Sequence, residues 1–444
     1  MRADARAERR HDRHGGMIGT ALGLLLALLG LALPVAAALA LLGGLLGALF
    51  TPIPLHLALG EIAWSASTNA LLVSVPLFVL LGEILLRSGI ADRLYGSMAA
   101  WLSWLPGGLM HANIGACMAF AATSGSSVAT AATIGTVAMP QIRRFNYPEP
   151  LFLGSLAAGG TLGILIPPSI NMIIYGWLTQ TSVPQLYLAG FVPGIVLGLI
   201  FMATILVCCI ARPGLAGDRP RGDWAARIES LPGLLPPLAI FVVVIGSIYA
   251  GWATATESAA LGVAAALLLA ALHGRLTVEV LVQALDGTMR TTGMIMLIVA
   301  GAWFLNFVLS AIGLVNALNG FITGLGLGPG QMLLAIIAFY VVLGCFMEPL
   351  PMMIVTVPVV TPLVVNAGYD PVWFGILVVL LCETAMVTPP VGVNLFVVQG
   401  VRGRGSINEV ILGVLPFIAS LFAMIALIVA FPQIALWLPR AIGS

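Results

Sequence analysis

The feature that most constrains this chain is a series of long apolar segments separated by short breaks containing Arg, Gly or Pro. Of its 444 residues, 60% are apolar and 8% are charged, whereas charged residues make up about 25% of an average soluble domain. About 20 apolar residues span a bilayer as a helix, and about ten segments approach that length. We therefore expect an all-α polytopic membrane protein that lies in the lipid bilayer.

The charge balance and the cysteines argue against several other classes of protein. The chain has 18 basic and 17 acidic residues, so no strong field of one sign favours nucleic acid as a partner. The five cysteines lie in apolar segments without a CxxC spacing or a nearby His. This pattern indicates neither a disulfide framework nor a zinc site.

The N-terminal region consists of a polar tail at residues 1–16 and an apolar run at residues 17–50. A helix of that length measures about 51 Å, which exceeds the thickness of one hydrocarbon core. Pro34 can divide the run into two short spans. It stays open whether this run crosses the membrane once or twice and on which side the N-terminus lies. Met17 also stays open as an alternative start of the chain.

The distribution of Arg predicts which loops face the cytoplasm. Arg occurs in five internal breaks, at residues 87–93, 143–144, 212–229, 275–290 and 402–404. The loops that lack Arg are expected on the periplasmic side, at residues 177–185, 313–329 and 366–371. Residues 91–104 and 276–290 mix charged and apolar side chains, which predicts arm helices at the membrane interface.

The sequence contains two diverged copies of one unit. A shift by 222 residues, half of the chain, places Pro167-Pro168 on Pro389-Pro390. A slip of one further residue aligns Asn171 with Asn394. Each copy therefore contains a Pro pair that is followed closely by an Asn.

The two copies are predicted to be inverted relative to each other across the membrane. Arg143 and Arg144 follow an interrupted segment of the first copy, whereas the equivalent turn of the second, at residues 366–371, contains no basic residue. Inverted repeats are the basis of alternating access in many transporters. We expect a first repeat at residues 17–211, a cytoplasmic linker at residues 212–232 and an inverted second repeat at residues 233–444.

Each copy is predicted to contain a re-entrant hairpin followed by a broken transmembrane helix. The hairpins are expected at residues 113–140, around ATSGSSVATAATIG, and at residues 330–366, around GCFMEPLP. The broken helices are expected at residues 150–176, around GILIPPSIN, and at residues 372–399, around VTPPVGVN. Proline releases carbonyls from the helical ladder, and such groups are tolerated in lipid only when they face protein or a polar cavity.

A hairpin tip opposite a broken helix gathers carbonyls, hydroxyls and an Asn side chain around one point. This environment suits a small hard cation such as Na⁺, with helix N-termini nearby for an anionic substrate. A proline kink, or a helix-packing surface at residues 124–127, is the structural alternative. Of the acidic residues within predicted spans, Glu348 lies at a hairpin tip and is the one most expected near a site; the others are Glu83, Glu257 and Glu383.

Four segments together resemble a known family: FAATSGSSVATAATIGTVAMPQIRRFNYPEPLFLGSLAAGGTLGILIPPSINMIIYG, TATESAA, GYDPVWFGIL and ETAMVTPPVGVNLFVVQG. From Met17 onward, the chain is similar to the large membrane subunit of tripartite ATP-independent periplasmic (TRAP) transporters. The resemblance implies a sodium-coupled, elevator-type secondary transporter in the bacterial inner membrane. It also implies a small four-helix membrane subunit and a periplasmic binding protein as partners. The substrate would be a small organic acid, such as a C4-dicarboxylate, a sugar acid or a sialic acid.

The resemblance further implies which residues bind the ions. The first site would combine the first hairpin tip with the break of the same copy: Ser124, Gly125, Ser126, Ser127, Pro167, Pro168, Ser169 and Asn171. The second would combine the tip at residues 345–350 with the second break: Glu348, Thr388, Pro389, Pro390, Gly392 and Asn394. Thr130 and Glu348 stand where many family members have Asp, which leaves the number of Na⁺ per cycle open.

Three other functions fit the sequence less well. A stand-alone sodium/dicarboxylate or citrate symporter has a similar plan without partners, but its Ser-Asn-Thr signatures are absent from both tips. An intramembrane hydrolase with a nucleophile near Ser126 lacks a His or Lys base at a recognisable spacing. We therefore do not expect an enzyme. A passive channel fits inverted repeats with breaks near the bilayer midplane less well than a carrier does.

Overall fold

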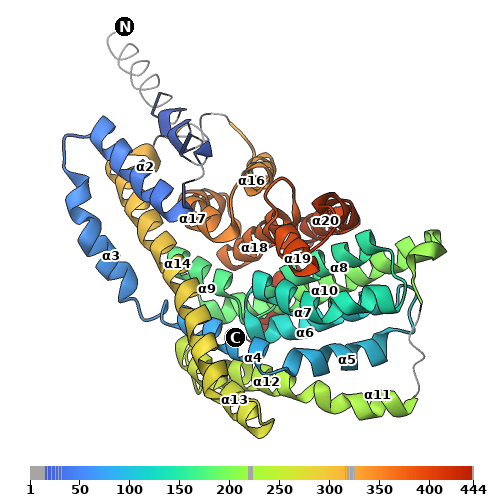
Figure 1. Cartoon of the computed structure of the whole chain (residues 1–444). Coiled ribbons are helices and arrows are strands. Elements are labelled where there is room, and N and C mark those ends of the chain that lie inside the picture. Colours follow the sequence, from blue (N-terminus) through green and yellow to red (C-terminus); the bar gives the residue numbers. More distant parts are fainter. Residues whose placement is uncertain are drawn as a thin grey trace.

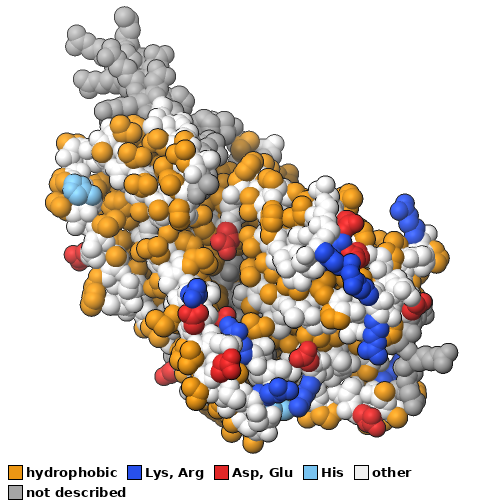
Figure 2. All heavy atoms as spheres, viewed as in Figure 1, with side chains coloured by type: hydrophobic (Ala, Val, Ile, Leu, Met, Phe, Trp, Pro, Cys, Tyr) orange, Lys and Arg blue, Asp and Glu red, His pale blue; other side chains and the backbone are white. Residues whose placement is uncertain are grey.

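The computed structural model describes residues 16–442 except 18, 22, 26, 29, 32, 219–223, 316, 318, 319, 321–323 and 325, and all regular structure in these residues is helical. Residues 1–15 of the predicted polar tail and residues 219–223 of the predicted linker lie outside this description. Apolar side chains cover much of the face shown in Figure 2, whereas charged side chains gather over its lower and right-hand parts.

Five described helices are long and apolar enough to cross a membrane: α10 (Val183–Ala211), α13 (Ala255–Leu272), α14 (Val278–Ala311), α17 (Pro349–Asn366) and α20 (Ile407–Ala430). The number rises to seven if each of two bent helix pairs is counted as one span. They are α4 (Ser74–Arg87) with α5 (Ile90–Leu102), bent by 71°, and Trp224–Gly233 with α12 (Leu235–Tyr249), bent by 42°. The predicted number was about ten because composition alone also counts shorter apolar helices as spans.

The long helix α14 lies lengthwise against the N-terminal part of the chain (Figure 1). It packs on α2 (Val35–Phe50), α3 (Leu59–Ser67) and α4, and the short η1 (Leu55–Ala58) joins α2 to α3. A Cβ added to Gly301 of α14 would lie 2.6 Å from the carbonyl oxygen of Ala36 in α2. The missing side chain therefore lets the two backbones touch, as is common between membrane helices.

The helix expected at residues 276–290 is continuous with the apolar segment that follows it. These residues begin the continuous 34-residue helix α14. An Asp286–Arg290 ion pair of 2.8 Å at i,i+4 spacing supports the helix where its side chains change from charged to apolar. The other predicted interfacial helix, at residues 91–104, corresponds to α5, which is separate.

A helical hairpin followed by an interrupted helix occurs in the first half of the chain. The hairpin consists of α6 (Leu109–Ser124) and α7 (Ser127–Arg144), which turn at Gly125 and Ser126. The interrupted helix consists of α8 (Glu149–Thr161), η2 (Leu162–Ile164) and, after a break at residues 165–169, α9 (Ile170–Thr179). Helix α10 follows, and η3 (Pro213–Leu215), α11 (Trp224–Ser230) and η4 (Leu231–Gly233) lead to α12.

The same order recurs in the second half of the chain. Helices α16 (Pro329–Gly344) and α17 form the hairpin, with residues 345–348 at its tip. The interrupted helix consists of α18 (Pro371–Val387) and α19 (Val393–Arg402), separated by residues 388–392. Helices α20 and α21 (Gln433–Ile442) end the chain. The helices of the two hairpins thus turn at residues 125–126 and 345–348, and the two breaks contain Pro167-Pro168 and Pro389-Pro390.

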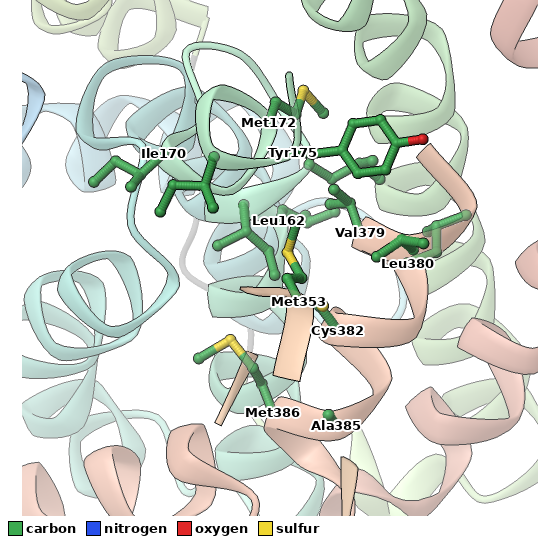
Figure 3. Packing of buried hydrophobic residues seen from close by; sticks show 14 of the residues in the cluster. Leu162, Ile170, Met172, Tyr175, Met353, Val379, Leu380, Cys382, Ala385 and Met386 are labelled. Carbon is green, nitrogen blue, oxygen red and sulfur yellow. The ribbon is translucent and has the colours of Figure 1, made fainter. Parts of the chain in front are cut away.

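Helices from the two halves pack closely around α8 and α18. Residues 372–387 of α18 are all buried, and η2, α9 and α17 lie against this helix (Figure 3). Helix α20 packs on α8 so closely that a Cβ on Gly413 would lie 1.7 Å from the carbonyl oxygen of Pro150. At the ends of these helices, Arg402 binds both Glu149 and Glu409, which fixes α8, α19 and α20 to one another.

Candidate functional site

The tip of the first hairpin lies against the first helix break. A Cβ on Gly125 would lie 2.7 Å from the carbonyl oxygen of Pro168. Gly125 has a φ of +60°, in the left-handed region that glycine adopts without strain. A Cβ on Gly163 would likewise lie 2.6 Å from the carbonyl oxygen of Ser126. Glycines on both sides therefore let the hairpin backbone approach the interrupted helix directly.

Hydroxyl groups organise this tip through hydrogen bonds to neutral oxygens. The Thr130 hydroxyl donates to the carbonyl oxygen of Ser126 at 2.8 Å and lies 2.9 Å from Ser124 Oγ. Ser127 Oγ donates to the carbonyl oxygen of Gly160 in α8 at 2.9 Å. These neutral contacts concentrate oxygen atoms at residues 124–130.

Asn394 joins the second break to the first hairpin. Its side chain is fully buried, and Nδ2 donates to Ser127 Oγ at 2.9 Å and to the carbonyl oxygen of Ala157 at 3.1 Å. Its Oδ1 is buried without a hydrogen-bond partner among the described residues. Buried polar atoms are normally paired, so this oxygen is free to accept a hydrogen bond from water or to coordinate a cation.

The second hairpin makes corresponding contacts. A Cβ on Gly344 would lie 2.6 Å from Cβ of Ala385 in α18, and Cys382 Sγ lies 4.0 Å from the carbonyl oxygen of Pro349. Asn171 at the start of α9 is buried, and its Nδ2 lies 3.5 Å from Sδ of Met353 in α17. Figure 3 shows Met353 within the apolar cluster that η2, α9, α17 and α18 form together.

The structure places each Asn against the hairpin of the other half. Asn171 contacts α17 and Asn394 contacts α7, whereas the sequence assigned each Asn to the hairpin of its own copy. The physical reason is that the helix after each break packs across the molecule, α9 on α17 and α19 on α7. Each hairpin therefore contacts the helix before its own break and the first turn after the other break.

The two breaks share part of their local geometry. Pro167-Pro168 and Pro389-Pro390 are both joined by cis peptide bonds. Ser169 caps α9, since its Oγ accepts from the Met172 N–H at 3.4 Å and donates to the Ile164 carbonyl at 2.5 Å. The equivalent cap of α19 is Gly392, with a φ of +28°.

The remaining residues of the predicted second site are less closely organised. The Thr388 hydroxyl donates to the Thr384 carbonyl of its own helix at 2.6 Å. Glu348 is half-buried at the N-cap of α17, and its side chain makes no capping hydrogen bond. Among the described residues, no group of three or more His, Cys, Asp and Glu side chains forms a metal cluster. The oxygens available to a cation are therefore mainly carbonyls, hydroxyls and amides.

Glu383 is a polar residue in this region to which the sequence assigned no role. It lies in α18, five residues before Thr388, and its side chain is 0% exposed. The sequence identifies it as an acid within a predicted span, but its position inside the protein depends on helices from both halves.

The fold is that of a membrane transporter of known structure. The chain resembles the YdaH transporter of Alcanivorax borkumensis with a TM-score of 0.61 at 15% identity, covering 90% of this chain and 98% of that one. This similarity concerns the fold alone.

The sequence comparisons define the family. Residues 22–434 match the family model described as "Tripartite ATP-independent periplasmic transporter, DctM component". The chain is 35% identical to the C4-dicarboxylate TRAP transporter large permease protein DctM of Pseudomonas aeruginosa, covering 86% of this chain and 88% of that protein. It therefore belongs to the TRAP transporter large permease family, as the sequence motifs predict, and is a transmembrane transporter subunit rather than an enzyme.

Other relatives are named for different substrates. The sialic acid TRAP transporter large permease protein of Vibrio cholerae is 32% identical, covering 84% of this chain and 87% of that protein. The ectoine/5-hydroxyectoine TRAP transporter large permease protein of Ruegeria pomeroyi is 34% identical, covering 83% of this chain and 86% of that protein.

Proposed function

We propose that this chain uses a sodium gradient to drive uptake of a small organic acid across the bacterial inner membrane. It does so as the permease subunit of a TRAP transporter, together with a small four-helix membrane subunit and a periplasmic binding protein. Family membership and the names of the relatives support this proposal, since they include permeases for a C4-dicarboxylate and a sialic acid.

The observation that carries sodium coupling is the unpaired Oδ1 of the fully buried Asn394. Its amide Nδ2 is held by Ser127 and Ala157, so the orientation of Oδ1 is fixed. In broken-helix transporters, carbonyls of unwound segments coordinate Na⁺. The predicted ligands of the first ion fit this requirement, because the first tip and break supply neutral oxygens.

Two further features belong to the same proposal: an inverted repeat and an elevator-type movement. Each hairpin contacts the helix before its own break through equivalent residues. Ser127 contacts Gly160 in the first half, and Pro349 contacts Cys382 in the second. These pairs are related by the 222-residue shift of the sequence. Such a repeat supports alternating access, because the two halves can exchange their environments by the same movement.

Uptake in proteoliposomes tests the coupling ion. We expect accumulation of a labelled organic acid, in vesicles containing all three proteins, only when an inward Na⁺ gradient is imposed. Replacement of Na⁺ by K⁺ on both sides should abolish accumulation while binding of substrate to the soluble partner continues. Equal uptake driven by a proton gradient without Na⁺ would contradict sodium coupling.

A further inference from the structure

Glu383 lies in the most buried helix of the site region without a partner for its charge. Its side chain is 0% exposed, and neither carboxyl oxygen has a hydrogen-bond partner among the described residues. The residues one turn away on α18 are all apolar and at most 4% exposed; they are Val379, Leu380, Met386 and Val387. Figure 3 shows three of them, Val379, Leu380 and Met386, within the apolar cluster.

No charged or titratable group of the surrounding helices neutralises this carboxyl through a hydrogen bond. The elements that pack on α18 are α8, α9, α10, α16, α17, α19, α20, α21 and η2. Their titratable or charged residues are Glu149, Tyr175, Tyr187, Cys208, Cys209, Tyr340, Arg402, Glu409 and Arg440, and α18 itself adds Cys382. None of them hydrogen-bonds Glu383.

Three of these side chains have other partners. Arg402 binds Glu149 and Glu409, Tyr340 pairs with Thr356 at 2.6 Å, and the Tyr175 hydroxyl donates to the Pro371 carbonyl at 2.7 Å. An ionised carboxylate buried among apolar side chains without a cation is strongly disfavoured. The least costly way to remove the charge is to bind a proton.

We propose that Glu383 is a proton-binding site of the transporter and carries its proton in the conformation described here. Binding forms one O–H bond on a carboxyl oxygen and changes no other bond. The site lies on the helix that precedes the second break, where Cys382 and Ala385 contact the second hairpin. A movement of that hairpin admits water to α18 and releases the proton, so the protonation of Glu383 is linked to the transport cycle.

Infrared spectroscopy of the purified full chain in nanodiscs tests the protonation state directly and does not depend on transport. At about pH 8, exposed carboxyl groups are ionised, so a protonated-carboxyl C=O band reports a buried acid. We expect this band in the wild type, its loss in Glu383→Gln, and its retention in the matched control Asp286→Asn, whose carboxylate is 59% exposed.

Three spectroscopic outcomes overturn the proposal. The first is the absence of the band from the wild type both with and without Na⁺, a result that stands even where Glu383→Gln fails to fold. The second is an undiminished band in a folded Glu383→Gln protein. The third is a band that appears only when Na⁺ is removed, which assigns Glu383 to a sodium site instead.

The link to the transport cycle rests on the proposed function and has its own measurement. Above the pH at which Glu383 loses its proton, wild-type sodium-driven uptake should fall about tenfold for each further pH unit, as the protonated fraction does. Glu383→Gln, which stays neutral, should not show this fall. A fall of the same size in Glu383→Gln overturns the link. Absence of sodium-driven uptake at every pH refutes the proposed function and leaves the infrared result standing.

Discussion

At the scale of single residues, Asn394 combines two contributions in one side chain. Its Nδ2 connects α19 to the first hairpin through Ser127 and to α8 through Ala157. Its Oδ1, buried and unpaired, is available to a cation. Removal of the side chain should therefore affect both the stability of the fold and the affinity for Na⁺, and these two effects can be measured separately.

We predict that Asn394→Ala raises the Na⁺ concentration for half-maximal uptake about tenfold, which corresponds to about 1.4 kcal/mol of lost ion binding. Loss of two buried hydrogen bonds should also lower the free energy of unfolding by about 1–3 kcal/mol. Asn171→Ala should weaken the binding of the other ion in the same way. Sodium titrations of uptake and thermal unfolding in detergent measure the two effects.

Asn113→Ala provides the matched control for this prediction. Asn113 is also fully buried, and it bonds Tyr95 at 2.9 Å and Ser155 at 2.9 Å, neither of which lies in a break. Its loss should lower stability without changing the sodium dependence. Wild-type sodium dependence in both Asn394→Ala and Asn171→Ala, at normal expression, would make these residues packing residues only.

The sequence predicted which residues belong to the candidate site better than it predicted which of them contact one another. The Pro pairs and the Asn after each of them are visible as a repeat, because each acts on its own stretch of backbone. The contact of Asn171 with Met353 joins residues 182 positions apart and depends on how α9 packs on α17. Glu383 was visible as an acid within a span, but its burial also required knowledge of the surrounding helices.

At the scale of helices, the contact between α8 and α20 depends on glycine. A Cβ on Gly154 would lie 2.0 Å from the carbonyl oxygen of Gly413, and one on Gly413 would lie 1.7 Å from that of Pro150. These distances are too short for any side chain, and the atoms in the way are backbone. Small residues in the interface thus allow the close approach that helices in membranes use in place of hydrophobic burial.

We predict that Gly413→Ala separates α8 from α20 and lowers the free energy of unfolding by about 1–3 kcal/mol. Gly293→Ala in α14 is the control, because a Cβ there meets nothing within 4 Å; it should be neutral or stabilise the helix by up to about 1 kcal/mol. Thermal unfolding of both variants in the same detergent provides the comparison. Equal shifts of the unfolding temperature in the two variants would mean that the contact between α8 and α20 does not limit stability.

The helix boundaries themselves were predictable where the sequence contains a local signal. Gly125 and the two Pro pairs mark a turn and two breaks, and these elements begin and end close to the predicted positions. No such signal separates residues 278–290 from the rest of α14, and the change from charged to apolar side chains does not interrupt the helix. In such a segment, composition predicts whether the side chains face lipid or water. Only residues that change the backbone conformation, such as Gly and Pro, predict where the helix ends.

At the scale of the whole molecule, the chain resembles TRAP permeases over nearly their entire length, covering 88% of the Pseudomonas aeruginosa protein. We predict that this chain alone, reconstituted in vesicles with an inward Na⁺ gradient, accumulates no more organic acid than protein-free vesicles do. The physical reason is that the proposed soluble partner supplies the substrate at the membrane surface, and the proposed small subunit supports the membrane-embedded part. Adding back each protein separately and then together should restore uptake only for the complete set. Strong uptake by the single chain would instead favour a stand-alone symporter, in which the hairpins and breaks bind both Na⁺ and substrate without delivery by another protein.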